Sequence, residues 1–434
     1  MSVNKSTWTD RLDEDALASR TARLVQEGHL EGERSLFVHD LERMASQLAQ
    51  LTDAFPSSAL HAVAVKANPV LGVLRHLVSL GAGLECASHE EVMLALAAGC
   101  APARVVFDSP AKTDEELAYA LNLGIHLNLD NFEELRRVAQ HVPTGGRPAG
   151  HVGLRINPQV GGGTIAATSV AGTFSKFGLP IRSRRAEIID AFARYPWLDG
   201  LHVHVGSQGC SIDQLVAAVK IAWELKEEIE SLRAAPVTEL DIGGGLPVAY
   251  VQGDTPPELE TYVAMLRAEV PGLFQGSADA APPRLITELG RAIHAGSGFA
   301  VSRIEYLKEE EGKRVAVIHL GADAFMRPVY QPESWRHEFL VLTADGRQKT
   351  SDTLEPVTVV GPLCFGGDVL ARDILLPALE PSDLLVVRDC GAYTLSLWSR
   401  HCNRGLPKVV GLEGTKIHVL KKRETAQDVV AFWS

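Results

Sequence analysis

Eight short runs of apolar, β-branched residues recur between about residue 60 and residue 290, with amphipathic stretches between them. The runs fall at 61–65, 83–86, 104–107, 125–129, 152–157, 201–205, 239–242 and 284–287. Strands that alternate with helices build a parallel sheet whose faces the helices cover. Eight such strands favour closure into a (β/α)8 TIM barrel over an open sheet, so the sequence predicts an α/β fold of this kind.

A second region begins near residue 298, where strand-like runs follow one another without the long amphipathic stretches of the barrel. These runs fall at 314–320, 338–343, 357–360, 384–389 and 416–420. A further run at 35–38 precedes the first barrel strand. We therefore expect a barrel domain over 40–298 and an all-β domain built from 1–39 and 299–434.

Charge and cysteine content narrow the class of protein. The chain has 42 Lys plus Arg against 54 Asp plus Glu, a net charge of −12, which argues against a nucleic-acid or anionic-membrane surface. It begins without an apolar signal core, and no uncharged stretch approaches the roughly 20 residues that span a bilayer, so we expect a cytoplasmic protein. The six cysteines show neither a CxxC pair nor zinc spacing, which predicts reduced thiols and no metal site.

Polar residues close several of the predicted barrel strands. Chemistry in such barrels collects at the carboxyl ends of the strands. The residues found there are Lys66, Glu85, Ser88, Asn128, Asp130, Arg155, His204, the run Gly243–Gly245, Glu288 and Arg291. A lysine delivered by a short apolar strand is a candidate for Schiff-base chemistry, with an exposed strand cap as the alternative.

The glycine run indicates an anion site, because residues without a Cβ let backbone N–H groups approach a phosphate; a tight turn is the alternative. The chain lacks a G-x-G-x-x-G after its first strand with an acid about 20 residues later, which disfavours a dinucleotide. Lys66, the glycine run, Glu288 and His204 match the needs of pyridoxal phosphate (PLP). Its aldehyde needs an amine, its phosphate needs N–H donors, and its ring nitrogen needs a carboxylate.

Sequence motifs in one order support this interpretation. They are Val65-Lys66-Ala67-Asn68, Ser88-His89-Glu90-Glu91, Arg155-Ile156-Asn157-Pro158, Ser175-Lys176-Phe177-Gly178, His202-Val203-His204-Val205-Gly206-Ser207-Gln208, Gly243-Gly244-Gly245-Leu246, Glu288-Leu289-Gly290-Arg291, Gly361-Pro362-Leu363-Cys364 with Asp368, and Gly391-Ala392-Tyr393. With them the chain resembles the fold type III (alanine racemase-like) PLP-dependent amino-acid decarboxylases, the group of diaminopimelate and ornithine decarboxylases. The resemblance runs from about residue 35 to the C-terminus.

The resemblance implies a role for each matching residue. Lys66 would carry the internal aldimine, His204 would stack on the cofactor ring, and Glu288 would face its nitrogen. The remaining cofactor-binding residues would be Arg155, Ser207, Gly243, Gly244, Gly245, Gly290, Arg291 and Tyr393. The resemblance also implies a homodimer with shared active sites, in which Cys364 from the second subunit is the proton donor at Cα; a small buried hydrophobe is the alternative for this thiol.

The chain departs from the family's pattern where the substrate would bind. Phe365 stands where relatives acting on diaminopimelate or diamine precursors place an acid, which leaves Asp368 as a candidate for a distal ammonium. Arg327, followed by Tyr330, is suited to a substrate carboxylate, with a structural arginine as the alternative. His401-Cys402 replaces the family's aromatic-Asn pair. We interpret these departures as altered specificity, for a lysine- or ornithine-type substrate or a carboxylated amino-acid conjugate.

The sequence thus predicts α-decarboxylation of an amino acid, in primary metabolism or in specialised biosynthesis. Two alternatives stay open at this level. One is an amino-acid racemase of the same fold. The resemblance disfavours it, because alanine racemases of this fold are similar in placing an arginine at the ring nitrogen, where this chain would have Glu288. The other is a non-catalytic PLP-binding or regulatory homologue, which the joint presence of Lys66, His204, Glu288 and Cys364 disfavours.

Overall fold

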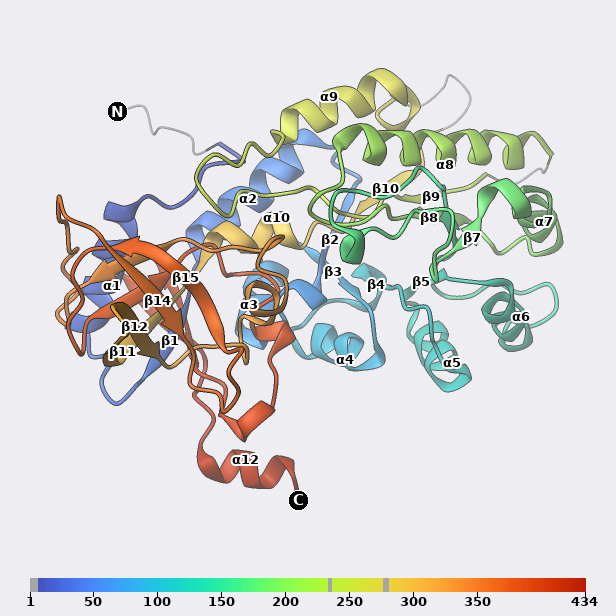
Figure 1. Cartoon of the computed structure of the whole chain (residues 1–434). Helices are drawn as coiled ribbons and strands as arrows, with labels where there is room; N and C mark the ends of the chain where they lie inside the picture. The colour runs from blue at the N-terminus through green and yellow to red at the C-terminus, as the bar shows by residue number, and fades with distance from the viewer. Residues whose placement is uncertain (1–6, 233–235, 276–280) are drawn as a thin grey trace. The chain divides into compact units, whose positions relative to one another are not determined.

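The computed structural model of the chain describes residues 7–232, 236–275 and 281–434. The chain divides into two compact units (Figure 1). The barrel unit consists of 1–9, 45–248 and 256–293, and the β unit consists of 10–44, 249–255 and 294–434. The limits predicted for the two domains stay a prediction, and each unit is described by itself.

Eight parallel strands form the closed barrel. They are β2 (Leu60–Ala64), β3 (Gly83–Cys86), β4 (Val105–Phe107), β5 (His126–Leu129), β6 (Val152–Asn157), β8 (Gly200–Val203), β9 (Glu239–Asp241) and β10 (Arg284–Thr287). Pairing runs in the order β5-β4-β3-β2-β10-β9-β8-β6, and a further β5–β6 pairing closes the ring. A short strand, β7 (Leu179–Pro180), adds to β6. The predicted barrel and all eight of its strands are therefore confirmed.

Helices connect the strands and lie outside the barrel (Figure 1). They are α2 (Leu41–Ala54), α3 (Leu71–Ser79), α4 (His89–Ala97), α5 (Asp114–Leu123), α6 (Phe132–His141), α7 (Ile181–Arg194), α8 (Ile212–Leu232), α9 (Leu259–Glu269) and α10 (Arg291–His294). Local sequence sets their ends: the side chains of Thr113 and Glu116 form a capping box at α5, and Gly124 ends that helix with φ 72°. Leu60, Ala62, Val106 and Ile286 fill part of the barrel interior.

The β unit is built on a second sheet. Its main path is β15-β14-β12-β11-β1-β17-β18, and β13 and β16 pair beside β11. The strands are β1 (Ser35–Asp40), β11 (Gly298–Glu310), β12 (Lys313–Ile318), β13 (Phe339–Leu342), β14 (Glu355–Val360), β15 (Val369–Leu376), β16 (Leu384–Val387), β17 (Lys408–Glu413) and β18 (Lys416–Lys421). Helix α1 (Glu14–Gln26) buries Leu17 and Leu24 in the core of this unit. The mostly-β second domain is confirmed.

The β unit differs from the sequence prediction in detail. β11, β15 and β17 coincide with none of the predicted runs, and two short helices, α11 (Met326–Tyr330) and α12 (Ala426–Phe432), lie where only strands and turns are predicted. In β15 the charged Arg372 and Asp373 are exposed on one edge strand, which obscures the apolar pattern.

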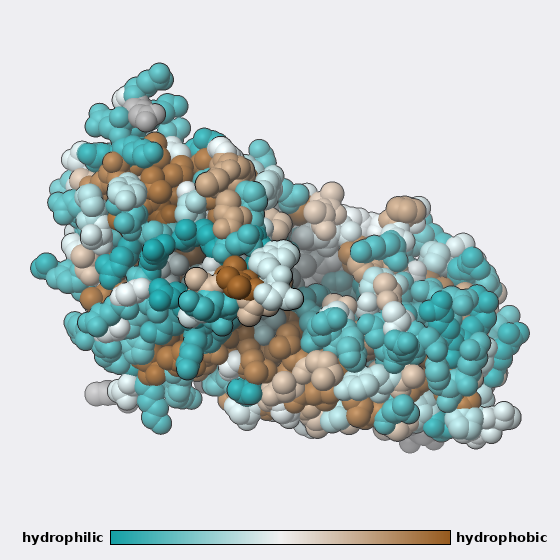
Figure 2. All heavy atoms as spheres, turned by 90° about the horizontal axis from the view of Figure 1, so that it is seen from below, coloured by the Kyte–Doolittle hydropathy of each residue, from teal (hydrophilic) through white to brown (hydrophobic). Residues whose placement is uncertain are grey.

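Hydrophilic and hydrophobic residues are both exposed on the face shown in Figure 2, and hydrophilic ones are the more abundant. Among the described residues, every helix is too short or too polar to cross a bilayer.

Candidate active site

Lys66 lies at the carboxyl end of β2, on the rim of the barrel. The strand ends at Ala64, and the chain turns into a 3-10 helix at Val65–Ala67, so the lysine stands just beyond the strand and not in it. Val65 and Ala67 are buried, whereas the Lys66 side chain is 38% exposed. The apolar neighbours fix the backbone here, and the amine is left at the barrel mouth.

The Lys66 amine forms an ion pair with Glu85, which lies in β3 beside β2. Burial raises the pKa of Glu85 to about 7, and the neighbouring ammonium acts in the opposite direction. A carboxyl group that titrates near neutrality therefore lies in hydrogen-bond contact with the amine. The pair can hold or release one proton at the pH of the cell.

His204 follows β8, and its ring is held by the glycine run. The Gly244 N–H donates a hydrogen bond of 3.1 Å to Nδ1 of His204. Burial, with the charges of Arg155 and Lys66, lowers the pKa of His204 to about 3. The imidazole is thus neutral, with its proton on Nε2, and it offers a flat uncharged face to a ligand.

Glu288 follows β10 and is 4% exposed. Burial raises the pKa of Glu288 well above its ordinary value, and the carboxylate of Asp241 raises it further. Its Oε1 atom is buried without a hydrogen-bond partner among the described residues. A buried acceptor of this kind is suited to a charged N–H donor on a ligand, because the ion pair would offset the cost of burying the carboxylate.

The glycine run packs against two other rim segments. A Cβ at Gly244 would lie 2.3 Å from the carbonyl oxygen of Glu288, and one at Gly245 would lie 2.2 Å from that of Gly206. Arg291 Nε donates a hydrogen bond of 3.1 Å to Ser207 Oγ. Gly290 lies against the lysine segment, since a Cβ there would be 2.9 Å from the Cβ atoms of Ala64 and Ala67. Close packing therefore brings the predicted phosphate residues of the barrel unit together.

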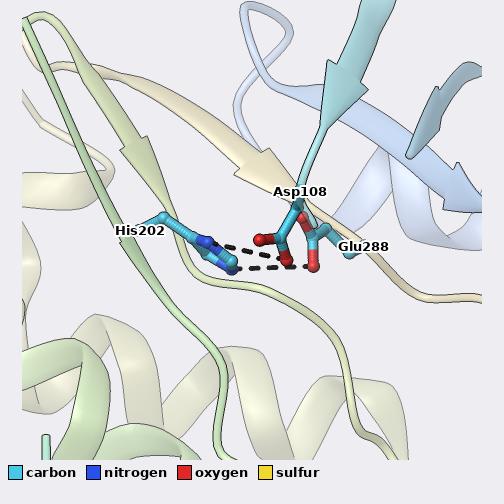
Figure 3. Close-up of side chains that lie close together, drawn as sticks. All are labelled: Asp108, His202 and Glu288. Atoms are coloured by element: carbon cyan, nitrogen blue, oxygen red, sulfur yellow. Dashed lines mark ion pairs between the residues drawn. The ribbon is translucent and has the colours of Figure 1, made fainter. Parts of the chain in front are cut away.

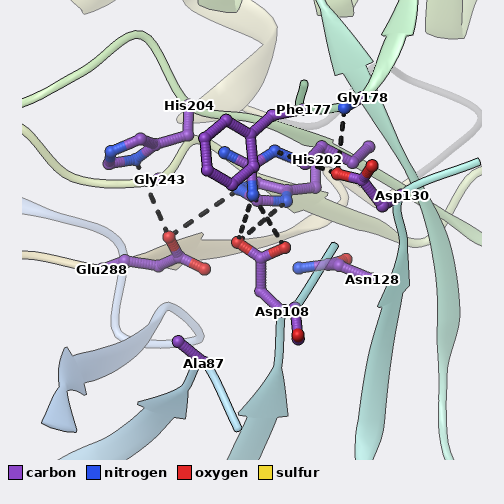
Figure 4. Close-up of polar contacts among 12 residues, drawn as sticks. Ala87, Asp108, Asn128, Asp130, Phe177, Gly178, His202, His204, Gly243 and Glu288 are labelled. Carbon is purple, nitrogen blue, oxygen red and sulfur yellow. Dashed lines mark hydrogen bonds and ion pairs between the residues drawn. The ribbon is translucent and has the colours of Figure 1, made fainter. Parts of the chain in front are cut away.

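Arg155 lies deeper in the barrel and is held by an acid. Its Nη1 donates to both carboxylate oxygens of Asp108, at 2.9 and 2.8 Å, and its guanidinium lies 4.5 Å from the centre of the Phe177 ring. Both partners, Asp108 and Phe177, are labelled in Figure 4. Burial alone would raise the pKa of Asp108, but Arg155 and other cations hold it well below its ordinary value. Arg155 is thus neutralised within the barrel, and direct contact with the cofactor stays a prediction.

His202 faces two buried acids, Asp108 and Glu288 (Figure 3). Its Nδ1 is 3.8 Å from Asp108 Oδ2, and its Nε2 is 3.7 Å from Glu288 Oε2. Burial lowers the pKa of His202 well below its ordinary value, which keeps the ring neutral. The ligand atoms of these three residues lie within 4.8 Å of one another, a spacing that a metal ion could bridge. Arg155 already supplies a counter-charge to this cluster, and the absence of a metal stays a prediction.

The predicted substrate residues of the β unit form an aromatic group. The rings of Tyr330 and Phe365 are stacked, with centroids 6.1 Å apart and an interplanar angle of 8°. The edge of His401 meets Phe365 at 5.6 Å. Cys364, beside Phe365, is exposed. The thiol therefore adjoins a small aromatic surface.

Asp368 is buried beneath this group. Its Oδ1 accepts from the Ala322 N–H and its Oδ2 accepts from the Leu363 N–H, both at 2.7 Å. The carboxylate thus fixes the backbone on which Cys364 is carried. The structure gives Asp368 this local role, and a contact with substrate stays a prediction.

Arg327, on α11, lies over two aromatic rings of the same unit. Its guanidinium is 4.5 Å from the ring centre of Trp335 and 4.3 Å from that of Tyr393. Tyr393 has a φ of 57°, a left-handed backbone that the surrounding packing must hold in place. Arg327 and Tyr393, predicted to bind substrate and cofactor respectively, are therefore neighbours.

Comparison with known proteins decides the family. Residues 41–295 match the family model described as "Pyridoxal-dependent decarboxylase, pyridoxal binding domain". The chain belongs to the pyridoxal-dependent decarboxylases. It is accordingly a PLP-dependent carboxy-lyase of the diaminopimelate and ornithine decarboxylase group. The family and cofactor predicted from the sequence are confirmed.

Relatives of this decarboxylase match it over most of their length. Diaminopimelate decarboxylase from Pseudomonas aeruginosa is 34% identical over 403 residues, 91% of each chain. The enzyme of the same name from Helicobacter pylori (strain J99) is 30% identical over 91% of this chain and 94% of its own. A crystal structure of a point mutant of diaminopimelate decarboxylase from Helicobacter pylori, complexed with L-lysine, superposes with a TM-score of 0.83 at 28% identity, covering 94% of this chain and 99% of that chain.

The rim of the decarboxylase fits its cofactor on structural grounds. The buried Oε1 of Glu288 can accept from a protonated ring nitrogen, and the neutral ring of His204 can face an aromatic ligand. The glycine run, Ser207 and Arg291 form a tight cradle of backbone and cationic groups beside Lys66. The donor set of the barrel unit is therefore the one that a phosphorylated aldehyde requires.

Sequence reasoning missed two acids of this decarboxylase. Asp108 directly follows β4, the one barrel strand before Arg155 whose end was left without a candidate, so the strand-end rule itself could have found it. Asp241 closes β9, and its oxygens accept from Asn128 Nδ2 and the Gly243 N–H, both at 2.9 Å. Burial raises the pKa of Asp241 to about 7. Its position at the end of a predicted strand was a signal in the sequence, but only the adjoining glycine run was considered there.

Proposed function

We propose that this carboxy-lyase removes the α-carboxylate of an amino acid related to diaminopimelate, lysine or ornithine, with a distal specificity of its own. One observation carries the proposal: Lys66, His204 and Glu288 lie on one rim of a closed barrel, where the charge of Lys66 lowers the pKa values of the other two and His204 Nδ1 is 3.8 Å from Glu288 Oε2. An amine, a neutral imidazole and a buried acid in that arrangement are the groups that a PLP decarboxylase needs.

The barrel unit would hold the cofactor. Lys66 would bind it covalently, His204 would lie against its ring, and Glu288 would keep its ring nitrogen protonated. The phosphate would be bound by Ser207, Gly243, Gly244, Gly245, Gly290 and Arg291, and contact of Tyr393 with the cofactor stays a prediction. Bound PLP supplies an electron sink for the charge left at Cα when carbon dioxide departs.

The chain's own residues would manage the protons. Glu85, whose pKa is about 7, would accept or return a proton at the Lys66 amine. Cys364, supplied by a second copy of the chain, would return a proton to Cα. The homodimer and the cytoplasmic location are parts of the proposal.

The substrate's distal end would meet the aromatic group of Tyr330, Phe365 and His401. A ring surface cannot neutralise an ammonium as a carboxylate does, although a cation–π contact contributes about 0.5–2 kcal/mol. Arg327 would bind a second carboxylate, and Asp368 would act through the backbone that it holds. These features support a substrate other than an unmodified diamine precursor, as specialised biosynthesis would use.

The test is carbon dioxide release from the PLP-loaded enzyme. Diaminopimelate, lysine, ornithine, arginine, their D-forms and larger carboxylated conjugates are compared, and the product is identified. We expect one class to release carbon dioxide and yield the corresponding amine. Inversion of the substrate at Cα without carbon dioxide would overturn the proposal in favour of a racemase.

The proton donor is tested by substitution. Cys364→Ser keeps a weak donor and Cys364→Ala removes it, and we expect turnover to fall by about 100-fold or more in the alanine variant. Full turnover of Cys364→Ala would remove the assignment. The glycine run and Lys66 are unchanged in both variants. The absorbance of the bound cofactor therefore serves as the control for folding.

A further inference from the structure

Two exposed cysteines of the β unit lie close together. Cys364 and Cys402 are exposed, whereas Cys86, Cys100, Cys210 and Cys390 are buried. The backbone N–H of Cys364 donates to Sγ of Cys402 over 3.3 Å. Because the Sγ of a cysteine is three bonds from its own nitrogen, rotation about χ1 of Cys364 alone sweeps its sulfur through the space beside that of Cys402.

The residues next to these cysteines hold the two segments together. His401 meets Phe365 edge-on at 5.6 Å, so neighbouring positions of the two segments are in contact at two successive points. The closeness of the two segments therefore rests on two separate contacts.

Each segment is also anchored on its other side. The first is tied down by Asp368, which accepts from the Leu363 N–H at 2.7 Å. The second is tied down by Arg400, whose guanidinium makes two bonds to Glu424 at 2.7 and 2.8 Å, and by Asn403 Oδ1, which accepts from Trp433 Nε1 at 2.7 Å. The proximity of the two thiols is thus built into the unit.

We propose that Cys364 and Cys402 form a reversible intrachain disulfide that switches the decarboxylase off. The oxidant is a hydroperoxide such as hydrogen peroxide. One thiolate attacks a peroxide oxygen, so that an S–O bond forms, the O–O bond breaks and water leaves after protonation. The second thiolate attacks the resulting sulfenic sulfur, the S–S bond forms and a second water leaves. The two thiols lose two electrons in all, and a dithiol reverses the reaction.

The effect on turnover rests on the proposed function. A sulfur engaged in a disulfide carries no proton, so Cys364 could not return one to Cα while the bond persists. Cys402, which stands in a segment that departs from the family's pattern, would be the resolving thiol. Because Cys402 lies next to a proposed substrate residue, the effect of peroxide on each variant is measured against that variant's own untreated turnover.

The experiment follows the disulfide and the activity separately. The PLP-loaded enzyme is reduced, freed of reductant and treated with graded hydrogen peroxide. Peptide mapping without reduction is then compared with the thiol count of the denatured chain and with carbon dioxide release. We expect a peptide linking Cys364 to Cys402, a fall from six thiols to four, and a loss of turnover that dithiothreitol restores.

Cys402→Ser is the decisive variant, with buried Cys210→Ser as its matched control. We expect Cys402→Ser to form no linked peptide and to recover less of its own untreated turnover with dithiothreitol than the parent enzyme does, because a sulfenic acid without a resolving thiol proceeds to the irreversible sulfinic acid. Cys210→Ser should behave as the parent enzyme. Recovery by Cys402→Ser equal to that of the parent enzyme, or a linkage only between two chains, would overturn the inference.

The two proposals fail in different ways. A linked peptide with undiminished turnover would uphold the disulfide and overturn the proton-donor role of Cys364. Absence of the linked peptide at peroxide levels that oxidise Cys364 to sulfinic acid would overturn the disulfide, and the activity of Cys364→Ala would still test the proton donor.

Discussion

In the barrel unit, Glu288 is 4% exposed and lies among other buried ionisable groups, whereas in the β unit Tyr330 is 63% exposed and stacks on Phe365. In the first environment, burial moves the pKa values of carboxyl groups and histidines far from their ordinary values. The second offers shape and ring surface. The proposed cofactor site and the proposed substrate site thus use different physics.

The largest effect is expected from the ionisable residues of the barrel unit, at Lys66. Lys66→Ala removes the amine that would bind the cofactor, and we expect turnover to fall by about 10,000-fold, the upper limit for a residue that also moves protons. Carbon dioxide release and the visible absorbance band of the bound cofactor measure the effect. Lys220→Ala, an exposed lysine of α8, is the control and should retain both.

Near-normal turnover of Lys66→Ala, with the absorbance band still bleached by borohydride, would show that another amine binds the cofactor.

Glu288→Gln tests whether buried charge acts on the cofactor. The substitution preserves shape but removes the negative charge opposite the ring nitrogen, so turnover should fall by about 100- to 1,000-fold, with a smaller effect on cofactor affinity. Steady-state kinetics and cofactor titration separate the two quantities. The exposed Glu260→Gln on α9 is the control. Equal losses in turnover and cofactor affinity would indicate a structural role for Glu288 instead.

Asp241 sharpens the comparison through the pH dependence of stability. Its pKa is about 7 in the folded protein, raised by burial, against about 3.9 when unfolded. The folded state thus binds more protons in this window, so this group's contribution is full below pH 4 and is lost as the pH rises to 7. Between pH 5 and pH 8 we expect the free energy of unfolding of the cofactor-free protein to fall by on the order of 1–3 kcal/mol through this group.

Asp241→Asn isolates this term because the variant cannot ionise at that position and keeps every other titratable group. Urea unfolding of both proteins from pH 5 to 8 gives the difference in their free energies of unfolding. A difference that is constant with pH, or that moves in favour of the parent protein as the pH rises, contradicts the burial argument.

The smallest expected effect concerns the aromatic end. Phe365→Glu restores an acid beside Cys364, and we expect kcat/KM for diaminopimelate or lysine to rise about 5-fold, since an ion pair at a partly exposed site contributes up to about 1 kcal/mol. Phe365→Gln has the same shape without the charge and should show no such gain. Equal kcat/KM values for the two variants would mean that Phe365 does not face the substrate's distal group.

The barrel could be predicted from the sequence because most of its strands are short, rich in apolar residues and buried on both faces, so the pattern is local. The same holds for Lys66 and Glu288, which stand next to such strands. Strand β15 could not be predicted in the same way, because it lies at the edge of its sheet and carries exposed charges that interrupt the apolar pattern. Only its pairing with β14 shows that it is a strand.

What the sequence alone determined is the order of strands and helices and the residue types at the strand ends, since these follow from periodicity within a few residues. Only the tertiary structure decided that Asp108 neutralises Arg155, that Gly244 fixes the tautomer of His204, and that Cys402 lies against Cys364 across 38 positions of sequence. Charge, proton position and thiol pairing depend on distances between residues remote in the chain, and no local pattern encodes such distances.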